Sequence, residues 1–142
     1  RSDVYLRNRP LNEKKYNISK HRFAELYNFC LQYNEWKDEL KYKTDNVASP
    51  AITDMPTAHN NESNVEALAL RRKQLLDKCK LVEQTAIETD PELYQYILKA
   101  VTTEYVTYNY LQTIMNIPCS RNTYYDRRRK FYFHLKKKKM IN

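Results

Sequence analysis

The side chains best suited to chemistry lie in one basic stretch, residues 117–139, which reads I-P-C-S-R-N-T-Y-Y-D-R-R-R-K-F-Y-F-H-L-K-K-K-K. If Ser120 caps a helix there, helical spacing places five polar residues on one face: Arg121, Asn122, Tyr125, Asp126 and Arg129. Arginine pairs with guanine and asparagine with adenine, while aspartate accepts from cytosine and tyrosine stacks or touches a thymine methyl. This face therefore suits the reading of base edges in double-stranded DNA.

The other cations of the stretch suit a different task. They are Arg127, Arg128, Lys130, Lys136, Lys137, Lys138 and Lys139. We expect them to contact phosphates, which position a protein on DNA without specifying sequence. A solvated amphipathic helix with a basic tail is the alternative interpretation of the same residues.

A preceding helix and a turn would hold this basic helix in place. Thr107 suits an N-cap, and apolar residues follow it at helical spacing: Tyr108, Leu111, Ile114 and Met115. Asn116 can adopt the left-handed conformation that ends a helix, and Pro118 prevents the helix from resuming. On the basic helix Tyr124, Phe131 and Leu135 point inward, with Tyr132 at their edge. Two helices joined by a tight turn predict a helix-turn-helix.

Upstream segments carry the apolar patterns of further helices. Asp90–Pro91 starts one whose core face is Leu93, Tyr94, Ile97, Leu98 and Val101. Asn64 is the expected cap of a long helix ending near Glu88, with a seam of Val65, Leu68, Leu75, Cys79, Val82 and Ala86. The seam suits either a homodimer through residues 65–88 or packing inside the helix's own domain.

The N-terminal part has one clear helical start. Ser19 suits an N-cap, and an apolar stripe follows at Phe23, Leu26, Tyr27, Cys30 and Tyr33, extended by Trp36 and Leu40. Residues 1–18 read as a polar, basic arm. The sequence thus predicts an all-α protein with an N-terminal arm and helical unit (1–43), a loop or linker (44–64), and a long helix followed by a helix-turn-helix DNA-binding unit with a basic tail (65–142).

Composition narrows the class of function. The net charge is +8, and nine of the 25 Lys and Arg residues lie in 117–142 with one acid, so the remaining chain holds 16 of each sign. Glycine is absent, which argues against phosphate-cradling nucleotide loops. The three histidines form no recognisable catalytic set, and His59 has no metal-ligand partner at suitable spacing. We expect no enzyme activity, no cofactor and no metal.

Cysteine usage and hydropathy bear on location. Cys30, Cys79 and Cys119 are widely separated and odd in number, which favours reduced thiols in a cytoplasm. No apolar run approaches the length of a membrane span, and no secretory leader is visible. The expected location is the cytoplasm of a bacterial host cell, without a membrane partner.

A resemblance adds to this interpretation. The run N-I-P-C-S-R-N-T-Y-Y-D-R-R-R-K-F resembles sigma-factor region-4-like helix-turn-helices, in which a turn, Ile and Ser precede a Thr–apolar–Tyr step and a basic helix. The wider layout, with Met55–Pro56 in a loop before a long helix, is similar to phage and prophage late-transcription regulators of the RinA/ArpU type. The resemblance covers residues 50–138 and is most specific over 107–132. Asn116 stands where that family often has Gly, and Arg128 where an apolar core residue is common.

The resemblance implies a sequence-specific DNA-binding activator of phage late genes that acts near host RNA polymerase. Two other functions stay open. One is a DNA-packaging protein similar to a terminase small subunit, which would act as a ring. The other is a protein-interaction inhibitor whose basic helix occupies the nucleic-acid site of a host enzyme.

Overall fold

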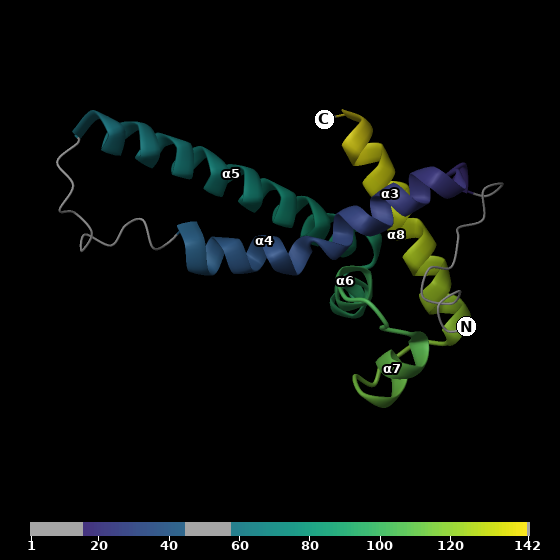
Figure 1. The fold of residues 1–142 in the computed structure, drawn as a ribbon. Helices are drawn as coiled ribbons and strands as arrows, with labels where there is room; N and C mark the ends of the chain where they lie inside the picture. The colour runs from purple at the N-terminus through teal and green to yellow at the C-terminus, as the bar shows by residue number, and fades with distance from the viewer. Residues whose placement is uncertain (1–15, 45–57, 142) are drawn as a thin grey trace. The chain divides into compact units, whose positions relative to one another are not determined.

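The computed structural model describes residues 16–44 and 58–141, and within those ranges every regular element is a helix, so the predicted all-α class is confirmed. The helices are α3 (Lys20–Leu31), α4 (Tyr33–Glu39), a π-helical turn η1 (Leu40–Thr44), α5 (Ala58–Thr89), α6 (Tyr94–Thr102), α7 (Tyr108–Thr113) and α8 (Arg121–Ile141) (Figure 1). None of the described helices has the length and apolarity that crossing a membrane requires.

The chain divides into two compact units. Unit 1 comprises Arg1–Gln32 and Leu81–Asn142, and unit 2 comprises Tyr33–Lys80, so α5 contributes to both. Unit 1 contains the predicted DNA-binding stretch. Each unit has its own buried side chains and is described by itself.

Unit 1 is built on the mutual packing of α3, α6 and α8. Its core takes Leu26 from α3, Ile97 from α6, and Phe131 and Leu135 from α8, all at most 1% exposed. Tyr132 was expected at the edge of this stripe, but it is 0% exposed, and its ring makes a T-shaped contact with the ring of Phe23, with centroids 5.0 Å apart. The reason is that α3 and α6 enclose α8 on a wider arc than a single neighbouring helix would.

Side-chain caps fix where the helices of unit 1 begin. The Oγ atoms of Ser19, Thr107 and Ser120 accept the backbone N–H of Arg22, Tyr110 and Thr123, respectively. Asp90 accepts the N–H groups of Glu92 and Leu93 in the turn before α6, but that helix begins at Tyr94, and its N-cap, Leu93, makes no side-chain cap hydrogen bond. The caps at Ser19, Thr107 and Ser120 were predicted from residue type, because short polar side chains satisfy the donors that the first helical turn leaves unpaired. Asp90 was expected to start α6 itself and instead holds the turn that precedes it.

The start of α5 was predicted wrongly. Asn64 was expected to cap this helix, but α5 already begins at Ala58, so Asn64 lies inside it. The expected loop of residues 44–64 is therefore helical from residue 58, and its residues 45–57 lie outside the described part of the chain. The start of the helix was placed too late because residues 58–64 are polar and lack the apolar periodicity on which the prediction depended.

The seam along α5 is only partly buried. Leu75 and Cys79 are buried in unit 2, and Val82 and Ala86 in unit 1, whereas Val65 is 55% exposed. The second half of the seam is thus used within the protomer. This burial matches the alternative in which the helix packs inside its own domain.

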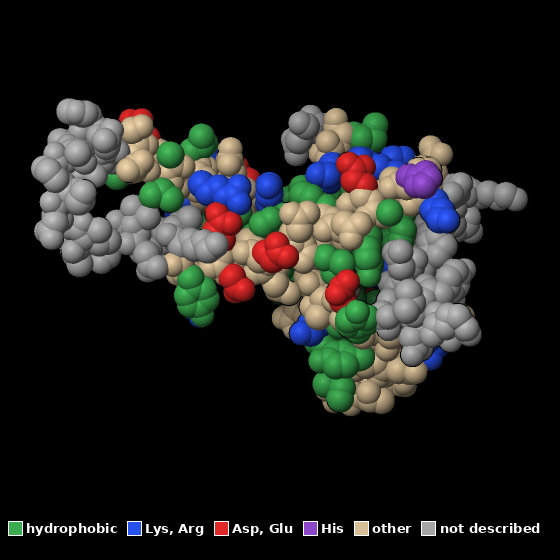
Figure 2. All heavy atoms as spheres, viewed as in Figure 1, with side chains coloured by type: hydrophobic (Ala, Val, Ile, Leu, Met, Phe, Trp, Pro, Cys, Tyr) green, Lys and Arg blue, Asp and Glu red, His purple; other side chains and the backbone are tan. Residues whose placement is uncertain are grey.

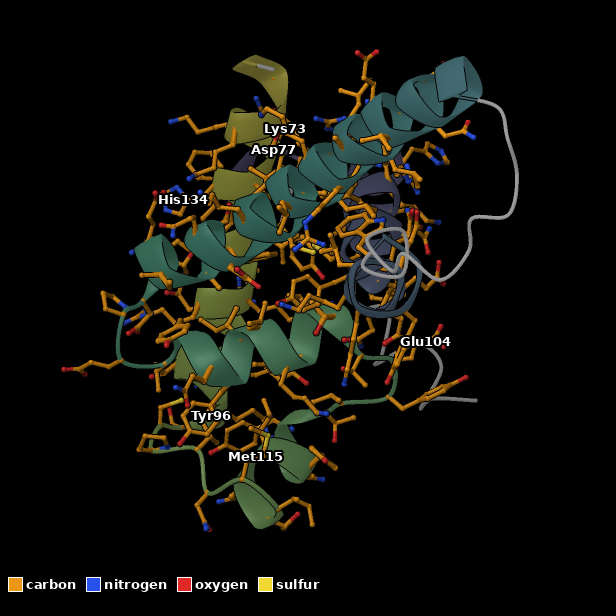
Figure 3. The ribbon with its side chains drawn as sticks, turned by 90° about the vertical axis from the view of Figure 1, so that its left-hand side faces the viewer. Lys73, Asp77, Tyr96, Glu104, Met115 and His134 are labelled. Atoms are coloured by element: carbon orange, nitrogen blue, oxygen red, sulfur yellow. The ribbon has the colours of Figure 1, made fainter. Side chains whose placement is uncertain are left out.

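Unit 2 pairs α4 and η1 with the first two-thirds of α5. Trp36, which was expected to extend the apolar stripe, is 4% exposed, and the ammonium of Lys78 lies 5.5 Å from its ring centroid. Glu39 receives two hydrogen bonds from Arg71, at 2.8 and 3.1 Å. Basic and acidic side chains are intermingled on the face of this unit in Figure 2, and Lys73 and Asp77 form an ion pair one turn apart on α5 (Figure 3).

Two smaller expectations have different outcomes. Ile114 was placed in the apolar stripe of α7, but α7 ends at Thr113 and Ile114 is 62% exposed at its C-cap. Cys30, Cys79 and Cys119 are free thiols, as expected. Burial raises the pKa of the Cys30 thiol, which keeps it protonated and unreactive.

The core of unit 1 gives a first testable prediction. Leu135→Ala leaves a cavity at a fully buried site, so we expect the free energy of unfolding to fall by about 2–5 kcal/mol. Urea denaturation followed by circular dichroism measures this change. Met140→Ala on the same helix is the control, because Met140 is 69% exposed and its loss removes no core contact. Equal effects of the two substitutions would show that α8 does not pack as described.

Candidate nucleic-acid interface

The turn between α7 and α8 is held from two sides. The N–H of Ile117 donates to the carbonyl oxygen of Leu111, 3.0 Å away, and the hydroxyl of Tyr108 donates to the carbonyl oxygen of Cys119. Asn116, the residue before Ile117, has φ 56°, the left-handed conformation predicted for it. Because Tyr108, Leu111 and Ile117 are buried, the turn is fixed to the core of unit 1.

The first turn of α8 presents two of the predicted base-reading residues. Arg121 and Asn122 are both exposed. The guanidinium of Arg121 donates to Oδ1 of Asn109 at 3.0 Å and lies over the ring of Tyr108, 5.1 Å from its centroid. Arg121 thus links α7 to α8 and has a preferred orientation before any ligand binds. Further along the predicted face, Tyr125 and Arg129 are half-buried.

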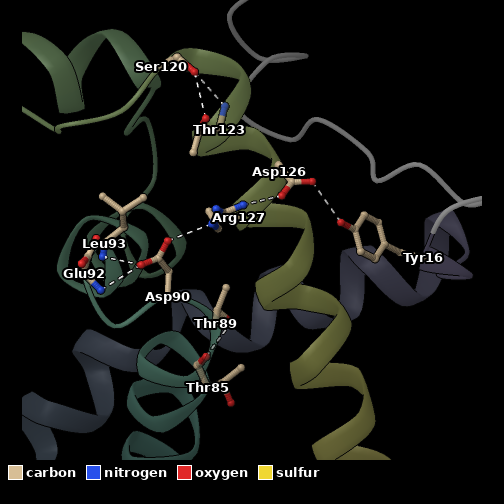
Figure 4. Close-up of polar contacts among 10 residues, drawn as sticks. All are labelled: Tyr16, Thr85, Thr89, Asp90, Glu92, Leu93, Ser120, Thr123, Asp126 and Arg127. Atoms are coloured by element: carbon tan, nitrogen blue, oxygen red, sulfur yellow. Dashed lines mark hydrogen bonds and ion pairs between the residues drawn. The ribbon is translucent and has the colours of Figure 1, made fainter.

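Asp126, the remaining residue of that face, is engaged within the protein (Figure 4). Its Oδ1 accepts the hydroxyl of Tyr16 at 3.3 Å, and its Oδ2 accepts Nη1 of Arg127 at 2.7 Å. Nε of Arg127 also donates to Oδ2 of Asp90, 2.9 Å away. The structure therefore gives Asp126 and Arg127 a role in joining parts of unit 1, where the sequence predicted contacts with a base and a phosphate.

The hydrogen bonds of this network stabilise the charged form of Asp90. Burial by itself raises the pKa of Asp90, but hydrogen bonds from Arg127 and from the N–H groups of Glu92 and Leu93 outweigh it, so the pKa lies below the ordinary value of 3.8. Asp90 thus caps the turn before α6 and ties it to α8.

Arg128 is the largest departure from the predicted interface. It was expected to contact phosphate, but it is only 7% exposed. Its guanidinium lies 5.5 Å from the ring centroid of Phe23 and 5.4 Å from that of Tyr132. The burial of Arg128 could have been predicted from helical spacing, because Arg128 comes four residues after Tyr124 and three before Phe131, on the inward stripe.

The basic tail is also partly engaged within unit 1. Lys136 donates to the carbonyl oxygen of Asn17 at 2.7 Å, and Lys138 pairs with Glu88 at 2.8 Å. The ammonium groups of Lys137 and Lys139 lie over the rings of Phe133 and Phe29, at 5.0 and 3.8 Å from the centroids. Among the predicted phosphate contacts, Lys130 and Lys137 are the exposed ones.

Residues 16–18 fall in the stretch that was expected to be a polar, basic arm, but two of them pack into unit 1. Tyr16 and Ile18 are buried, and the ring of Tyr16 lies 5.6 Å from that of Phe133 on α8. The burial of Ile18 could have been predicted, because Ile18 and Phe23 flank the Ser19 cap at the spacing of a hydrophobic staple. The chain therefore enters α3 from the side of α8, next to Asp126.

Comparisons with known proteins supply no relatives. No family model matches the chain, and neither the curated proteins nor the solved structures contain a match. Within the described residues, no group of three or more His, Cys, Asp or Glu side chains is arranged to hold a metal ion.

The network around Asp90 predicts an acid-sensitive contribution to stability. Since the folded-state pKa of Asp90 is lowered, its stabilisation is present above about 3.8 and is lost as pH falls through the lower folded value. Asp90→Asn should lower the free energy of unfolding by about 1–2 kcal/mol at pH 7 and flatten its decline below pH 3.8. Urea denaturation at several pH values tests this. A variant whose acid limb is as steep as that of the wild type would contradict the assignment.

His134 on α8 predicts a second pH dependence (Figure 3). Burial, together with the charges of Lys130 and Lys137, lowers its pKa from 6.5, while Glu88 opposes and Lys138 adds to this effect. The unfolded chain then takes up the proton more readily, so stability is full above pH 6.5 and declines as pH falls below it. His134→Gln should reduce that decline between about pH 6.5 and 5. His21→Gln, at an exposed position of α3, is the control and should not change it.

Proposed function

We propose that this chain is a sequence-specific double-stranded DNA-binding protein, in which α7 and α8 act as a helix-turn-helix and the start of α8 enters the major groove. The observation that carries the proposal is the exposure of Arg121 and Asn122 at the capped start of a 21-residue helix whose opposite face is buried. A helix supported on one face by a core and polar at its free N-terminal end is the geometry with which such motifs reach base edges.

Preorganisation supports Arg121 in this role. The contacts with Asn109 and Tyr108 restrain a side chain that would otherwise lose rotamer freedom on binding. The hydrogen bond to Asn109 occupies part of a guanidinium that carries five N–H donors. Arg121 can therefore keep its contact with α7 while it donates to guanine.

The charge of unit 1 supports DNA as the partner. The exposed cations Lys130 and Lys137 lie on the same helix as Arg121 and Asn122, and their types suit contacts with phosphates. We further propose, from the resemblance, that the protein regulates phage late transcription beside host RNA polymerase. A packaging protein or an inhibitor of a host nucleic-acid enzyme are the outcomes that the following experiment separates.

The testing experiment is selection from a pool of random duplexes, with affinity measured over a salt series. With four or five phosphates neutralised, log K should fall against log salt with a slope of about −4. An enriched motif supports a regulator. Binding without a motif, by a ring-sized assembly, would favour packaging, and no binding at moderate salt would favour a protein partner.

Two variants separate sequence reading from phosphate contact. Asn122→Ala should cost about 1–3 kcal/mol at one base pair and relax preference there. Lys137→Ala should weaken all sequences alike and reduce the salt slope by about 1. Asn122 is a cleaner probe than Arg121, because truncating Arg121 also removes its contacts with α7. If both variants lost affinity without any change in preference, α8 would not be the recognition helix.

A further inference from the structure

Unit 1 contains a pocket bounded by α3, the connection between α6 and α7, and α8. Seven of its lining residues carry polar groups: Tyr27, Thr103, Tyr105, Thr107, Tyr124, Tyr125 and Arg128. The cavity has a volume of about 20 Å³, which is room for one water-sized atom. Its walls thus combine hydroxyl groups with a single guanidinium.

The guanidinium of Arg128 is packed between aromatic side chains. The rings of Phe23 and Tyr132 lie within 5.5 Å of its guanidinium carbon. Stacking uses the faces of the guanidinium plane, whereas its hydrogen bonds are made in the plane. Arg128 therefore gives the pocket a positive charge in surroundings that are drier than the surface, where attraction for an anion is stronger.

The outer wall is shaped by a strained residue. Tyr105 has φ 69°, which is unfavourable for a residue with a bulky side chain and is retained only where its surroundings enforce it. Next to it, Thr107 caps α7 and also lines the pocket. The connection that shapes the pocket is thus the one that positions α7.

We propose that this pocket receives one non-bridging oxygen of a phosphodiester in the DNA bound by α8, so the inference rests on the proposed function. Size favours a phosphate that stays mostly outside, because the cavity admits one oxygen atom and not a whole phosphate group. Location favours the same ligand, since Tyr125 belongs both to the pocket wall and to the predicted base-reading face. Arg128 then contacts phosphate from inside the protein.

The decisive experiment replaces single backbone phosphates of a bound duplex with neutral methylphosphonates. One position should cost about tenfold in affinity with the wild-type protein, as expected for a charge-assisted contact. With Arg128→Met, affinity for the unmodified duplex should fall about tenfold, the salt slope should fall by about 0.9, and the same methylphosphonate should cost nothing further. The ranking of sequences should not change.

Controls separate charge from folding. Lys80→Met removes one exposed charge in unit 2 and should leave both affinity and slope unchanged. Because Arg128 is buried, folding of its variants is checked by urea denaturation. Tyr105→Asn removes the outer wall with a residue that tolerates positive φ, and Tyr105 is itself exposed, so this variant tests the pocket without touching the core. It should weaken binding at the same phosphate.

Each remaining outcome overturns a distinct part of the proposal. If DNA binding persists and no phosphate couples to Arg128 or Tyr105, the pocket inference fails and the proposed function stands. If inorganic phosphate shifts the amide resonances of residues 103–107 at submillimolar concentration while no backbone phosphate couples, the pocket takes a free anion and the inference also fails. If the wild-type chain binds no DNA, the proposed function itself fails.

Discussion

Burial of one face of α8 is the constraint on which the rest of unit 1 depends. Tyr124, Phe131 and Leu135 are at most 2% exposed, and Tyr132 widens the buried face toward α3. A helix held this firmly along its inner side presents its outer side in a fixed orientation. The exposed start of α8 is therefore oriented by side chains up to about four turns further along the same helix.

Much of this arrangement was predictable because its causes are local. Caps at Ser19, Thr107 and Ser120, the left-handed Asn116 and the inward stripe of α8 all follow from residues within one or two turns. The failures at Asn64 and Ile114 are local as well. Residues 58–64 are helical although their composition is polar, so the start of α5 was placed too late. The apolar spacing after Thr107 continues to Ile114, one residue beyond the end of α7.

The candidate site was less predictable, because its departures come from partners distant in sequence. Asp126 is engaged by Tyr16, 110 residues earlier, and Lys136 by Asn17, 119 residues earlier. No spacing rule connects such pairs. Arg128 is different, since its place on the inward stripe could be read from spacing, but charged residues are so rarely buried that residue type outweighed position.

Ion pairs within unit 1 offset part of the positive charge that the sequence places at the C-terminal end. Nine cations against one acid made the last 26 residues strongly positive, yet Glu88 and Asp90 come from outside that segment and pair with Lys138 and Arg127. Arg127 pairs with Asp126 in addition. These ion pairs offset the charges of Arg127 and Lys138, whereas Arg121, Lys130 and Lys137 are exposed cations of the same helix.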